Sequence, residues 1–466
     1  MRNINFFLYL FFRYLKRHFR TLLLVIIVIT VATGAFWYFK EKVFRKTITQ
    51  GIVGTYTEND IPQAVTNLLS KGLVIMDDKG SPKANLVNNW QVSEDAKVYT
   101  FNLKKDLKWS DGNSVKSSQL GVAIEDVKIT YPNDLTIKFE LLDSFSPLPS
   151  LLTRPILKEG SLVGIGPYKV ANLYKDPRNK VFINKIVLTN DDYSLPNVVI
   201  RFYPNEKIAK NALQMGEIQS LIAVNSTSDF NDQKPFTSWS KTNFQRIVAI
   251  FYNTQDEVLS DKNFRLALSY AAPKIKGETA AKTSIPQSSW AYNDEVREFL
   301  SKPKESDEAL EKVKNGASST ITLTVTTNLK EVGEQVIKEW KKQGIKARLQ
   351  VESGIPQNYQ ALLIAQNIPS DPDQYSLWHS TQSQTNISRY NSKTSNFSAR
   401  VDKNLEDGRK ITDQKERKLR YYDFQKILQD DAPATFLYFP KFNIVYLKKV
   451  EDSLNKILPL QFPELN

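Results

Sequence analysis

The chain of 466 residues contains no cysteine and only two histidines. The absence of thiols excludes disulfide bonds, a cysteine nucleophile and a lipid anchor attached through a cysteine side chain. His18 precedes a long apolar stretch, so His379 is the single imidazole in the rest of the chain, which excludes a metal site built from several histidines. We therefore predict no metal, no cofactor and no catalytic residue, and only a mechanism that uses carboxylates alone stays open as an enzymatic alternative.

The positive charge of the chain is concentrated at its N-terminus. Residues 1–46 carry a net charge of +8 out of the total of +13, which leaves +5 for all the residues that follow. In those residues basic and acidic side chains are interspersed, and they do not form the basic stripe with aromatic platforms that nucleic acids require. The charge is therefore a signal of membrane topology, and we predict no nucleic-acid partner.

Residues 21–39 form an apolar run of nineteen residues without a charged side chain. A helix of this length rises about 1.5 Å per residue and can cross a hydrocarbon layer of about 30 Å. Basic residues precede the run, and the aromatic residues 36–39 close it. We predict a basic cytoplasmic segment at 1–20, a transmembrane helix at 21–39 and a linker at 40–47, so that the protein spans the cell membrane once with its main domain outside.

A cleaved signal peptide is the alternative interpretation, because residues 32–35 offer the small side chains that a peptidase prefers. The apolar core is, however, longer than the about 7 to 15 residues of a signal peptide, and a second basic group follows it directly. These features favour an uncleaved helix that anchors the protein.

The 420 residues from 47 to 466 are enough for two or three domains of about 100 to 200 residues each. Alternating apolar and polar residues predict a strand at 98–103 and a hairpin around 132–134. Residues 321–351 predict a strand, an amphipathic helix and a second strand, which is the pattern of a parallel unit. The sequence thus indicates an α/β body.

Five segments carry a resemblance to a known family. They are LVNNWQVSEDAKVYTFNLKKDLKWSDGNSV, GIGPYKV, IFYNTQDEVLSDKNFRLALSYA, SDPDQYSLWHSTQSQTNISRYN and ERKLRYYDFQKILQDDAPATFLY. In this order they resemble the motifs of family 5 of the bacterial extracellular solute-binding proteins, which includes the peptide- and nickel-binding receptors of ABC importers. The resemblance extends from Thr55 to Phe439.

The resemblance implies a fold with two α/β lobes, a periplasmic-binding-protein-like clamshell of type II that encloses its ligand between the lobes. Lobe 1 is expected at 48–246, lobe 2 at 247–434, and the chain is expected to return to lobe 1 at 435–466. The accessory subdomain of the family, at about 113–160, is expected to be reduced to little more than a hairpin, because this part of the chain is short.

The family also implies candidate ligand-binding residues. Asp371 and Asp373 frame a proline, and the functional interpretation is a cleft wall that aromatic side chains cover, whereas the alternative is an Asp-Pro turn that starts a helix. Other positions match the first strand of the family, the expected crossing between the lobes and an aromatic edge of the cleft. The seven candidates are Tyr56, Asn253, Trp290, Asp371, Asp373, Tyr375 and Trp378.

One departure from the family concerns the ligand. Peptide-binding members often carry an aspartate shortly before the Asp-Pro pair, where it can pair with a free amine of the ligand. In this chain the corresponding residues 366–370 are uncharged. The resemblance therefore predicts a cleft that does not distinguish a free peptide N-terminus from an acetylated one.

The function implied is that of a membrane-anchored, extracytoplasmic substrate-binding protein of an ABC importer, a monomer and not an enzyme, which binds a peptide or a similar small polar solute and delivers it to permease subunits. Two alternatives stay open. One is a surface hydrolase that depends on carboxylates, and the other is an anchored sensor or chaperone with the same fold. Turnover of peptides or glycans would identify the first, and the absence of a neighbouring permease would favour the second.

Overall fold

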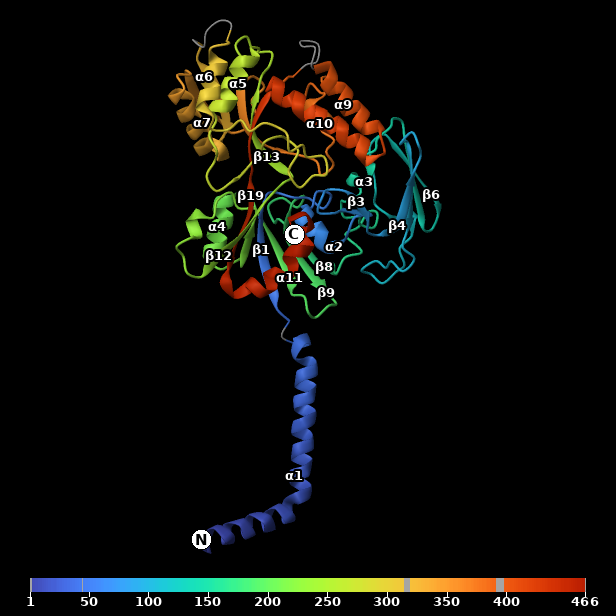
Figure 1. Ribbon diagram of the computed structural model, residues 1–466. Helices are drawn as coiled ribbons and strands as arrows, with labels where there is room; N and C mark the ends of the chain where they lie inside the picture. The colour runs from blue at the N-terminus through green and yellow to red at the C-terminus, as the bar shows by residue number, and fades with distance from the viewer. Residues whose placement is uncertain (1, 44, 314–318, 391–397, 466) are drawn as a thin grey trace.

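The computed structural model describes residues 2–43, 45–313, 319–390 and 398–465. It begins with one long helix, α1 (Arg2–Val43), which extends away from the rest of the protein (Figure 1). Within α1, the stretch Lys16–Gly34 is long and apolar enough to cross a membrane, and none of it is buried against the rest of the protein. The apolar run expected at 21–39 therefore lies inside a longer helix.

The first lobe is built on a seven-stranded sheet in the order β12-β19-β11-β1-β10-β9-β8. β1 runs parallel to β10 and β11, and the other neighbours are antiparallel. Apolar side chains that alternate along these strands form its core with α2 and α11. The elements are β1 (Thr47–Val53), α2 (Gln63–Leu69), β8 (Tyr168–Lys175), β9 (Ile183–Asn190), β10 (Asn197–Tyr203), α4 (Glu206–Gln214), β11 (Ser220–Ile222), η2 (Ser228–Phe230), β12 (Phe236–Thr242), β19 (Lys441–Leu447), η5 (Lys448–Val450), α11 (Glu451–Gln461) and η6 (Pro463–Leu465).

The second lobe is built on a six-stranded sheet in the order β14-β18-β13-β17-β15-β16. One face packs on α5, α6 and α7, and the other face packs on α8, α9 and α10. The elements are β13 (Arg246–Tyr252), α5 (Lys262–Ala271), β14 (Thr279–Ala280), α6 (Pro303–Leu310), β15 (Ile321–Thr326), η3 (Thr327–Leu329), α7 (Lys330–Lys342), β16 (Ala347–Glu352), β17 (Ala361–Asn367), α8 (Tyr375–Trp378), α9 (Ser398–Lys410), α10 (Gln414–Asp431) and β18 (Ala434–Phe439).

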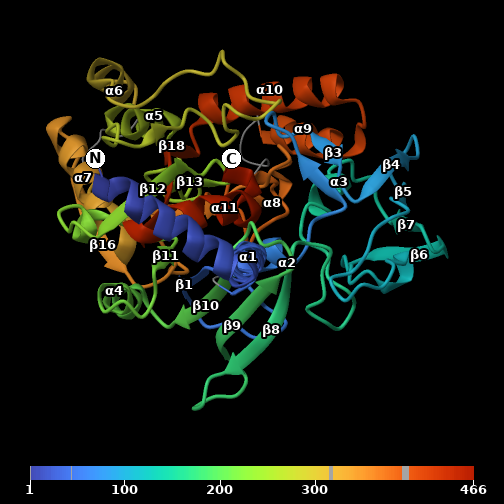
Figure 2. The ribbon, with the colours of Figure 1, turned by 90° about the horizontal axis from the view of Figure 1, so that it is seen from below.

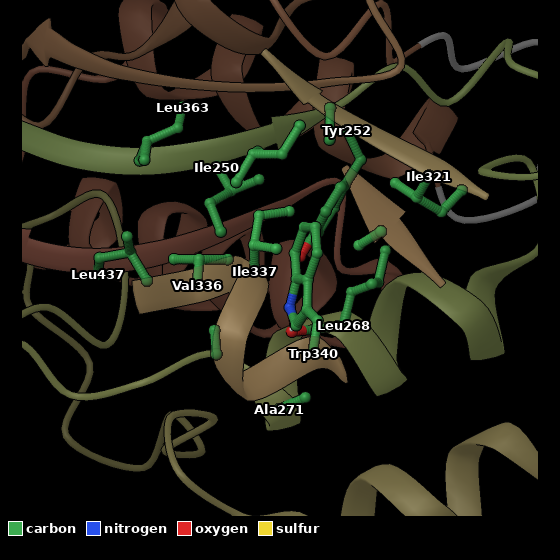
Figure 3. Close-up of a cluster of buried hydrophobic side chains, with 14 of the residues drawn as sticks. Ile250, Tyr252, Leu268, Ala271, Ile321, Val336, Ile337, Trp340, Leu363 and Leu437 are labelled. Carbon is green, nitrogen blue, oxygen red and sulfur yellow. Dashed lines mark hydrogen bonds between the residues drawn. The ribbon is translucent and has the colours of Figure 1, made fainter. Parts of the chain in front are cut away.

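The parallel unit expected at 321–351 is confirmed, because β15 and β16 pair in parallel with α7 between them. The period of α7 places Val336, Ile337 and Trp340 on the face that packs against the sheet. Trp340 is fully buried, and its indole N–H donates to the carbonyl of Leu268 at 2.9 Å (Figure 3). The one polar atom of this large side chain is thus satisfied inside the core.

A third body extends from the first lobe, and it is larger than the sequence suggested. Its four-stranded sheet has the order β4-β5-β7-β6, and a core that includes Phe101, Trp109 and Phe139 lies beneath it. The hairpin in the expected subdomain 113–160 is present, but β7 pairs with β5 and completes a sheet that starts before residue 113. The elements are β2 (Val74–Met76), β3 (Pro82–Ala84), β4 (Val87–Val92), β5 (Val98–Leu103), η1 (Ser117–Gln119), β6 (Val127–Asn133), β7 (Thr136–Leu141) and α3 (Leu148–Leu151).

Two short segments connect the lobes, residues 243–245 between β12 and β13, and Pro440 between β18 and β19. They lie side by side, since the amide of Asn243 donates to the carbonyl of Pro440 at 2.9 Å. The return to the first lobe was expected at 435, but β18 pairs with β13 and β14 and so belongs to the second sheet. The chain re-enters the first lobe at Lys441 instead.

Candidate functional site

Two cavities flank the connecting segments where the lobes meet. The smaller cavity, of about 420 Å³, is lined by the β2–β3 loop of the third body, by residues of the second lobe and by residues 463–465. The larger cavity, of about 780 Å³, is lined by both lobes. The first connecting segment separates the two, because Phe244 and Gln245 line the smaller cavity while Asn243 and Arg246 line the larger one.

The larger cavity lies where strands of both sheets end. The loop after β11 contributes residues 223–226 from the first lobe, and the segment after β15 contributes residues 327–332 from the second. Val248, Ala365 and Tyr438 add apolar surface, whereas asparagines from both lobes and from the connecting segment add amide groups. A concave site that combines apolar walls with a few polar groups, and that lies between two bodies, has the character of a ligand site.

Charges in the larger cavity differ in how well they are neutralised. Lys210 forms ion pairs with Glu206 at 2.9 Å and Asp229 at 2.7 Å, so this cation is already compensated. Arg246 is exposed and makes no side-chain hydrogen bond or ion pair with the residues that the structure describes. One carboxylate oxygen of Glu278, Oε2, is buried and also has no partner there. The cavity therefore presents a cation, Arg246, without an ion pair and a carboxylate oxygen of Glu278 without a hydrogen-bond partner among the described residues.

The smaller cavity is closed by contacts between the third body and the second lobe. The amide of Trp290 donates to the carbonyl of Lys79 at 2.7 Å. Gly80 has a φ of +74°, and an added Cβ would lie 3.5 Å from the carbonyl oxygen of Ser370, so a residue without a side chain suits this turn. Gln245 donates to the hydroxyl of Ser370 at 2.7 Å and ties the connecting segment to the same place.

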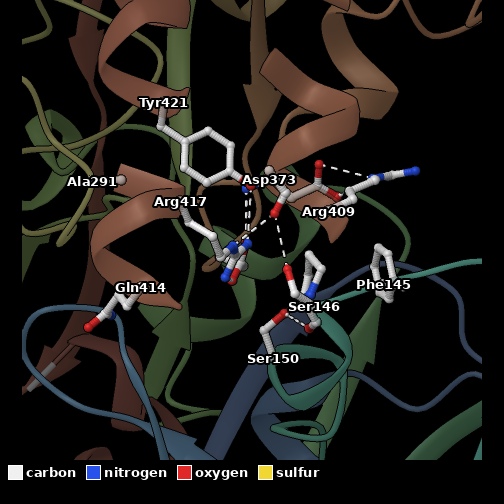
Figure 4. Close-up of polar contacts among 12 residues, drawn as sticks. Phe145, Ser146, Ser150, Ala291, Asp373, Arg409, Gln414, Arg417 and Tyr421 are labelled. Carbon is white, nitrogen blue, oxygen red and sulfur yellow. Dashed lines mark hydrogen bonds and ion pairs between the residues drawn. The ribbon is translucent and has the colours of Figure 1, made fainter. Parts of the chain in front are cut away.

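The two candidate aspartates have arginine partners from the neighbouring helices α9 and α10 (Figure 4). Asp371 accepts two hydrogen bonds from Arg417, at 2.7 and 3.1 Å, and both side chains are buried. Asp373 accepts from Arg409 at 2.9 to 3.1 Å; burial raises the pKa of Asp373, and Arg409 partly offsets this effect. Both carboxylates thus stabilise the second lobe, which agrees with the structural interpretation of this motif as an Asp-Pro turn.

The two candidate aromatic residues of α8 lie beside these pairs. Tyr375 stacks on the guanidinium of Arg409, with 3.9 Å between the charge centre and the ring, and on the ring of His379 at 4.0 Å. Trp378 is only 1% exposed and packs between Phe251 and Phe436 in the core. The structure therefore places Trp378 in the core of the lobe and not on a cavity wall.

The remaining candidates are dispersed. The indole ring of Trp290 lies beside the guanidinium of Arg417, and its N–H is buried without a partner among the described residues, next to Ser289 of the smaller cavity. Tyr56 follows β1 at the end of the sheet that faces the second lobe, and its hydroxyl donates to the carbonyl of Val53, the last residue of the strand. The expectation that Asn253 marks the crossing between the lobes is wrong, because it follows β13 at the end away from the connecting segment.

Sequence reasoning missed the residues of the larger cavity. Arg246 stands at the predicted lobe boundary, which was a usable signal. Glu278 lies in a mixed stretch, KIKGETAAK, that contains no motif and gave no signal. The first residue of β13 and the turn before β14 carry these side chains, and their place in one cavity depends on contacts between segments far apart in the sequence.

The third body also contacts the second lobe directly beside the aspartate pairs. The amide of Ser146 donates to the carbonyl of Arg409 at 2.7 Å, and its hydroxyl donates to the carbonyl of Gly408 at 3.0 Å. The ring of Phe145 lies 5.2 Å from the guanidinium of Arg409. Figure 2 shows α3 and the third body beside α9, so these contacts bridge a body attached to the first lobe and the second lobe. We call them the bridging contacts.

The comparisons with known proteins agree with this geometry. Residues 81–120 and 114–388 match the profile of the bacterial extracellular solute-binding proteins, family 5 Middle. The oligopeptide-binding protein AppA of Bacillus subtilis is 24% identical over 479 residues, which cover 85% of each chain. The dipeptide-binding protein of Escherichia coli is 24% identical over 343 residues, which cover 57% of this chain and 62% of that protein.

Solved structures share the fold. NikZ from Campylobacter jejuni, in complex with Ni(L-His), has a TM-score of 0.67 at 22% identity and covers 86% of this chain and 94% of its own. The substrate-binding protein CtaP of Listeria monocytogenes has a TM-score of 0.70 at 19% identity with the same coverage. With its two lobes, its paired connecting segments and the matched residues, the chain belongs to family 5 of the bacterial extracellular solute-binding proteins.

Proposed function

We propose that the protein is the extracytoplasmic substrate-binding component of an ABC importer, that it holds a peptide or a similarly small polar solute between its lobes, and that α1 anchors it in the membrane. The larger cavity carries the proposal, because both lobes and both connecting segments form its walls. A ligand there contacts both lobes at once and favours the closed arrangement over the open one.

The size and chemistry of the cavity support a small polar ligand. Its volume of about 780 Å³ falls within the about 300 to 1,000 Å³ that is typical of small-molecule sites. Asn225, Asn243 and Asn328 line it, and amide groups that both donate and accept suit the peptide unit. Several relatives are named for peptides, which supports the same class of ligand for this chain.

Binding without chemistry accounts for the residues in the cavity. The residues that line it include no histidine, and its carboxylates are Asp229, Glu278 and Glu331. Asp229 is already paired with Lys210. Among the residues that the structure describes, no group of three histidine, aspartate or glutamate side chains is arranged to hold a metal ion. Turnover of a peptide or glycan library by the purified protein would contradict a pure binding role.

The anchor has its own test. A retained α1 should keep the full-length protein in membranes during carbonate extraction, and external protease should release a fragment that starts between residues 40 and 48. Recovery of a soluble protein with a new N-terminus near residue 36 would identify a cleaved signal peptide instead.

The binding function is tested by native mass spectrometry of the full-length protein in detergent after gentle purification. We expect a co-purified small polar molecule, and adding it back to stripped protein should raise the melting temperature, because a ligand that binds only the folded state stabilises it. It should also reduce the distance between labels on the two lobes. A confirmed ligand that leaves this distance unchanged would contradict closure around the ligand.

A neighbouring permease and its ATPase distinguish an importer from an anchored sensor or chaperone. The importer proposal requires that the liganded protein stimulates ATP hydrolysis by that permease complex in proteoliposomes. Ligand binding without such stimulation by any neighbouring permease complex would favour the sensor.

A further inference from the structure

The position of Glu278 is fixed by its local backbone. The residue closes a turn in which its amide donates to the carbonyl of Ile275 at 3.3 Å, and Gly277 takes the positive φ of +84° that the turn needs. β14 follows at once and pairs with β18, next to the second connecting segment. Both Ile275 and Glu278 line the larger cavity, so the turn presents the glutamate at the wall of the proposed ligand site.

The carboxylate of Glu278 is incompletely satisfied. Its Oε2 atom is buried and has no hydrogen-bond partner among the described residues. Burial raises the pKa of Glu278, and the charge and backbone amide of Lys441 only partly counteract that rise. A buried acceptor without a donor is costly and calls for a partner that the protein itself does not supply.

The other carboxylates of the cavity are poorer candidates for that role. Asp229 already pairs with Lys210. Glu331 is exposed and stands in the first turn of α7, where a negative charge interacts favourably with the helix N-terminus. Glu278 is therefore the carboxylate in this cavity that combines a buried, unpartnered oxygen with a position between the lobes.

We infer that Glu278 receives the ammonium group of the ligand, so that the larger cavity selects solutes with a free amine, such as a short peptide with an unmodified N-terminus. The inference rests on the proposed function and deepens it. It also revises the expectation from residues 366–370, because an acid from the turn before β14 takes the role for which that uncharged stretch has no side chain. An ammonium group supplies both the missing donor and a compensating charge.

The experiment uses the full-length protein in detergent, stripped of bound ligand. A library of tripeptides is offered as an equimolar mixture of free and N-acetylated forms, and native mass spectrometry measures which form the protein retains. The variants are E278Q, which removes the charge, and E295Q, a control that removes the charge of an exposed glutamate of the second lobe outside the cavity. The melting temperature of each variant without peptide reports on its folding.

We expect the wild-type protein and E295Q to retain the free forms at least tenfold better than the acetylated forms, and E278Q to retain both within about threefold. E278Q should melt at or above the temperature of the wild type, since it removes a buried charge, whereas a purely structural carboxylate would lower that temperature when replaced. If E278Q does not fold, E278D is used, which keeps the charge one methylene further away and should lose part of the preference.

The two possible failures differ. Equal retention of free and acetylated peptides by the wild type, or an unchanged preference in E278Q, would overturn the role of Glu278 and leave the proposed function intact. Retention of neither form by well-folded wild-type protein would overturn peptide binding itself.

Discussion

Replacing Asp371 with alanine should destabilise the second lobe by about 3 to 5 kcal/mol. The substitution leaves Arg417 without its carboxylate partner in a site where the two side chains are only 8% and 5% exposed. Burial alone would lower the pKa of Arg417, and the attraction of Asp371 is what raises it. A guanidinium is not deprotonated in proteins, so the arginine stays charged after its partner is removed. An unpaired buried charge is the reason for the large cost.

The size of this loss of stability follows from the contacts that Arg417 keeps after the substitution. Arg417 keeps hydrogen bonds to the carbonyl of Gly408 at 2.9 Å and to the hydroxyl of Tyr421 at 3.1 Å. These neutral acceptors satisfy two of its donors but supply no compensating charge. The loss therefore falls in the range of broken buried pairs, well above the about 0 to 1 kcal/mol of exposed pairs.

The assay is thermal unfolding of the full-length protein in detergent, followed by tryptophan fluorescence. For a lobe of this size each kcal/mol shifts the melting temperature by about 2 to 4 °C, so D371A should melt about 6 to 20 °C lower. E295A is the control, because Glu295 pairs with Lys426 in the same lobe but both side chains are more than half exposed. Its melting temperature should change by less than about 4 °C.

The same variant separates the two interpretations of Asp371. A D371A protein that melts like the wild type but binds ligand more weakly would refute the structural role and support a ligand contact. A large loss of stability, with unchanged affinity measured well below the melting transition, is the outcome that we expect.

Three further predictions address the core, the cavity and the bridging contacts. Trp340→Ala should cost about 3 to 5 kcal/mol in urea unfolding, because it removes a fully buried indole ring. Burial raises the pKa of Glu278, which lies beside Lys441 and Tyr438, above its usual value, and tripeptide affinity should fall as the pH drops through this pKa. Above the same pKa the ionised carboxylate should lower the stability of the unliganded fold. E278Q should flatten the pH profiles of both the affinity and the stability. Phe145→Ala combined with Ser146→Ala should lengthen the distance between spin labels on the third body and the second lobe, because it removes the ring and the hydroxyl of the bridging contacts. Engineered cysteines make the labels unique, since the chain has none. An unchanged distance would show that these two side chains do not hold the two bodies together.

The periodicity of the sequence and the order of its motifs were sufficient to predict that the protein has two α/β lobes. The stretch that forms β15, α7 and β16 changes from an alternating to a helical pattern within about thirty residues, and both patterns are local properties of the chain. Five motifs in order then implied the clamshell, which the family match confirms. Local signals of this kind need no knowledge of distant contacts.

The third body shows where local signals end. The hairpin of β6 and β7 was visible in the sequence, but its pairing with β5 joins strands more than thirty residues apart. The sequence of a hairpin does not determine which other strand pairs with its edge, so the size of the third body could not be predicted. The position of β18 in the second sheet is a similar non-local pairing.

For the site, the motif around Asp371 was informative about folding and not about the ligand. An Asp-Pro pair indicates a turn from local chemistry, but the sequence does not say that Arg417 from a helix some forty residues later lies opposite. Glu278 presents the converse case, a residue without any motif whose importance appears only when its unpartnered oxygen and the cavity are seen together.

The roles of Asp371 and Glu278 reflect a division between residues that build the lobes and residues that line the cavity. The motif residues lie in turns, cores and buried ion pairs, where a substitution costs several kcal/mol, so they maintain the structure of the lobes. The cavity walls are formed by residues at strand ends, such as Arg246 and Glu278, whose replacement leaves the cores untouched. Under the proposed function, ligand choice depends on a few side chains at strand ends, and these can change while the cores of the lobes are preserved.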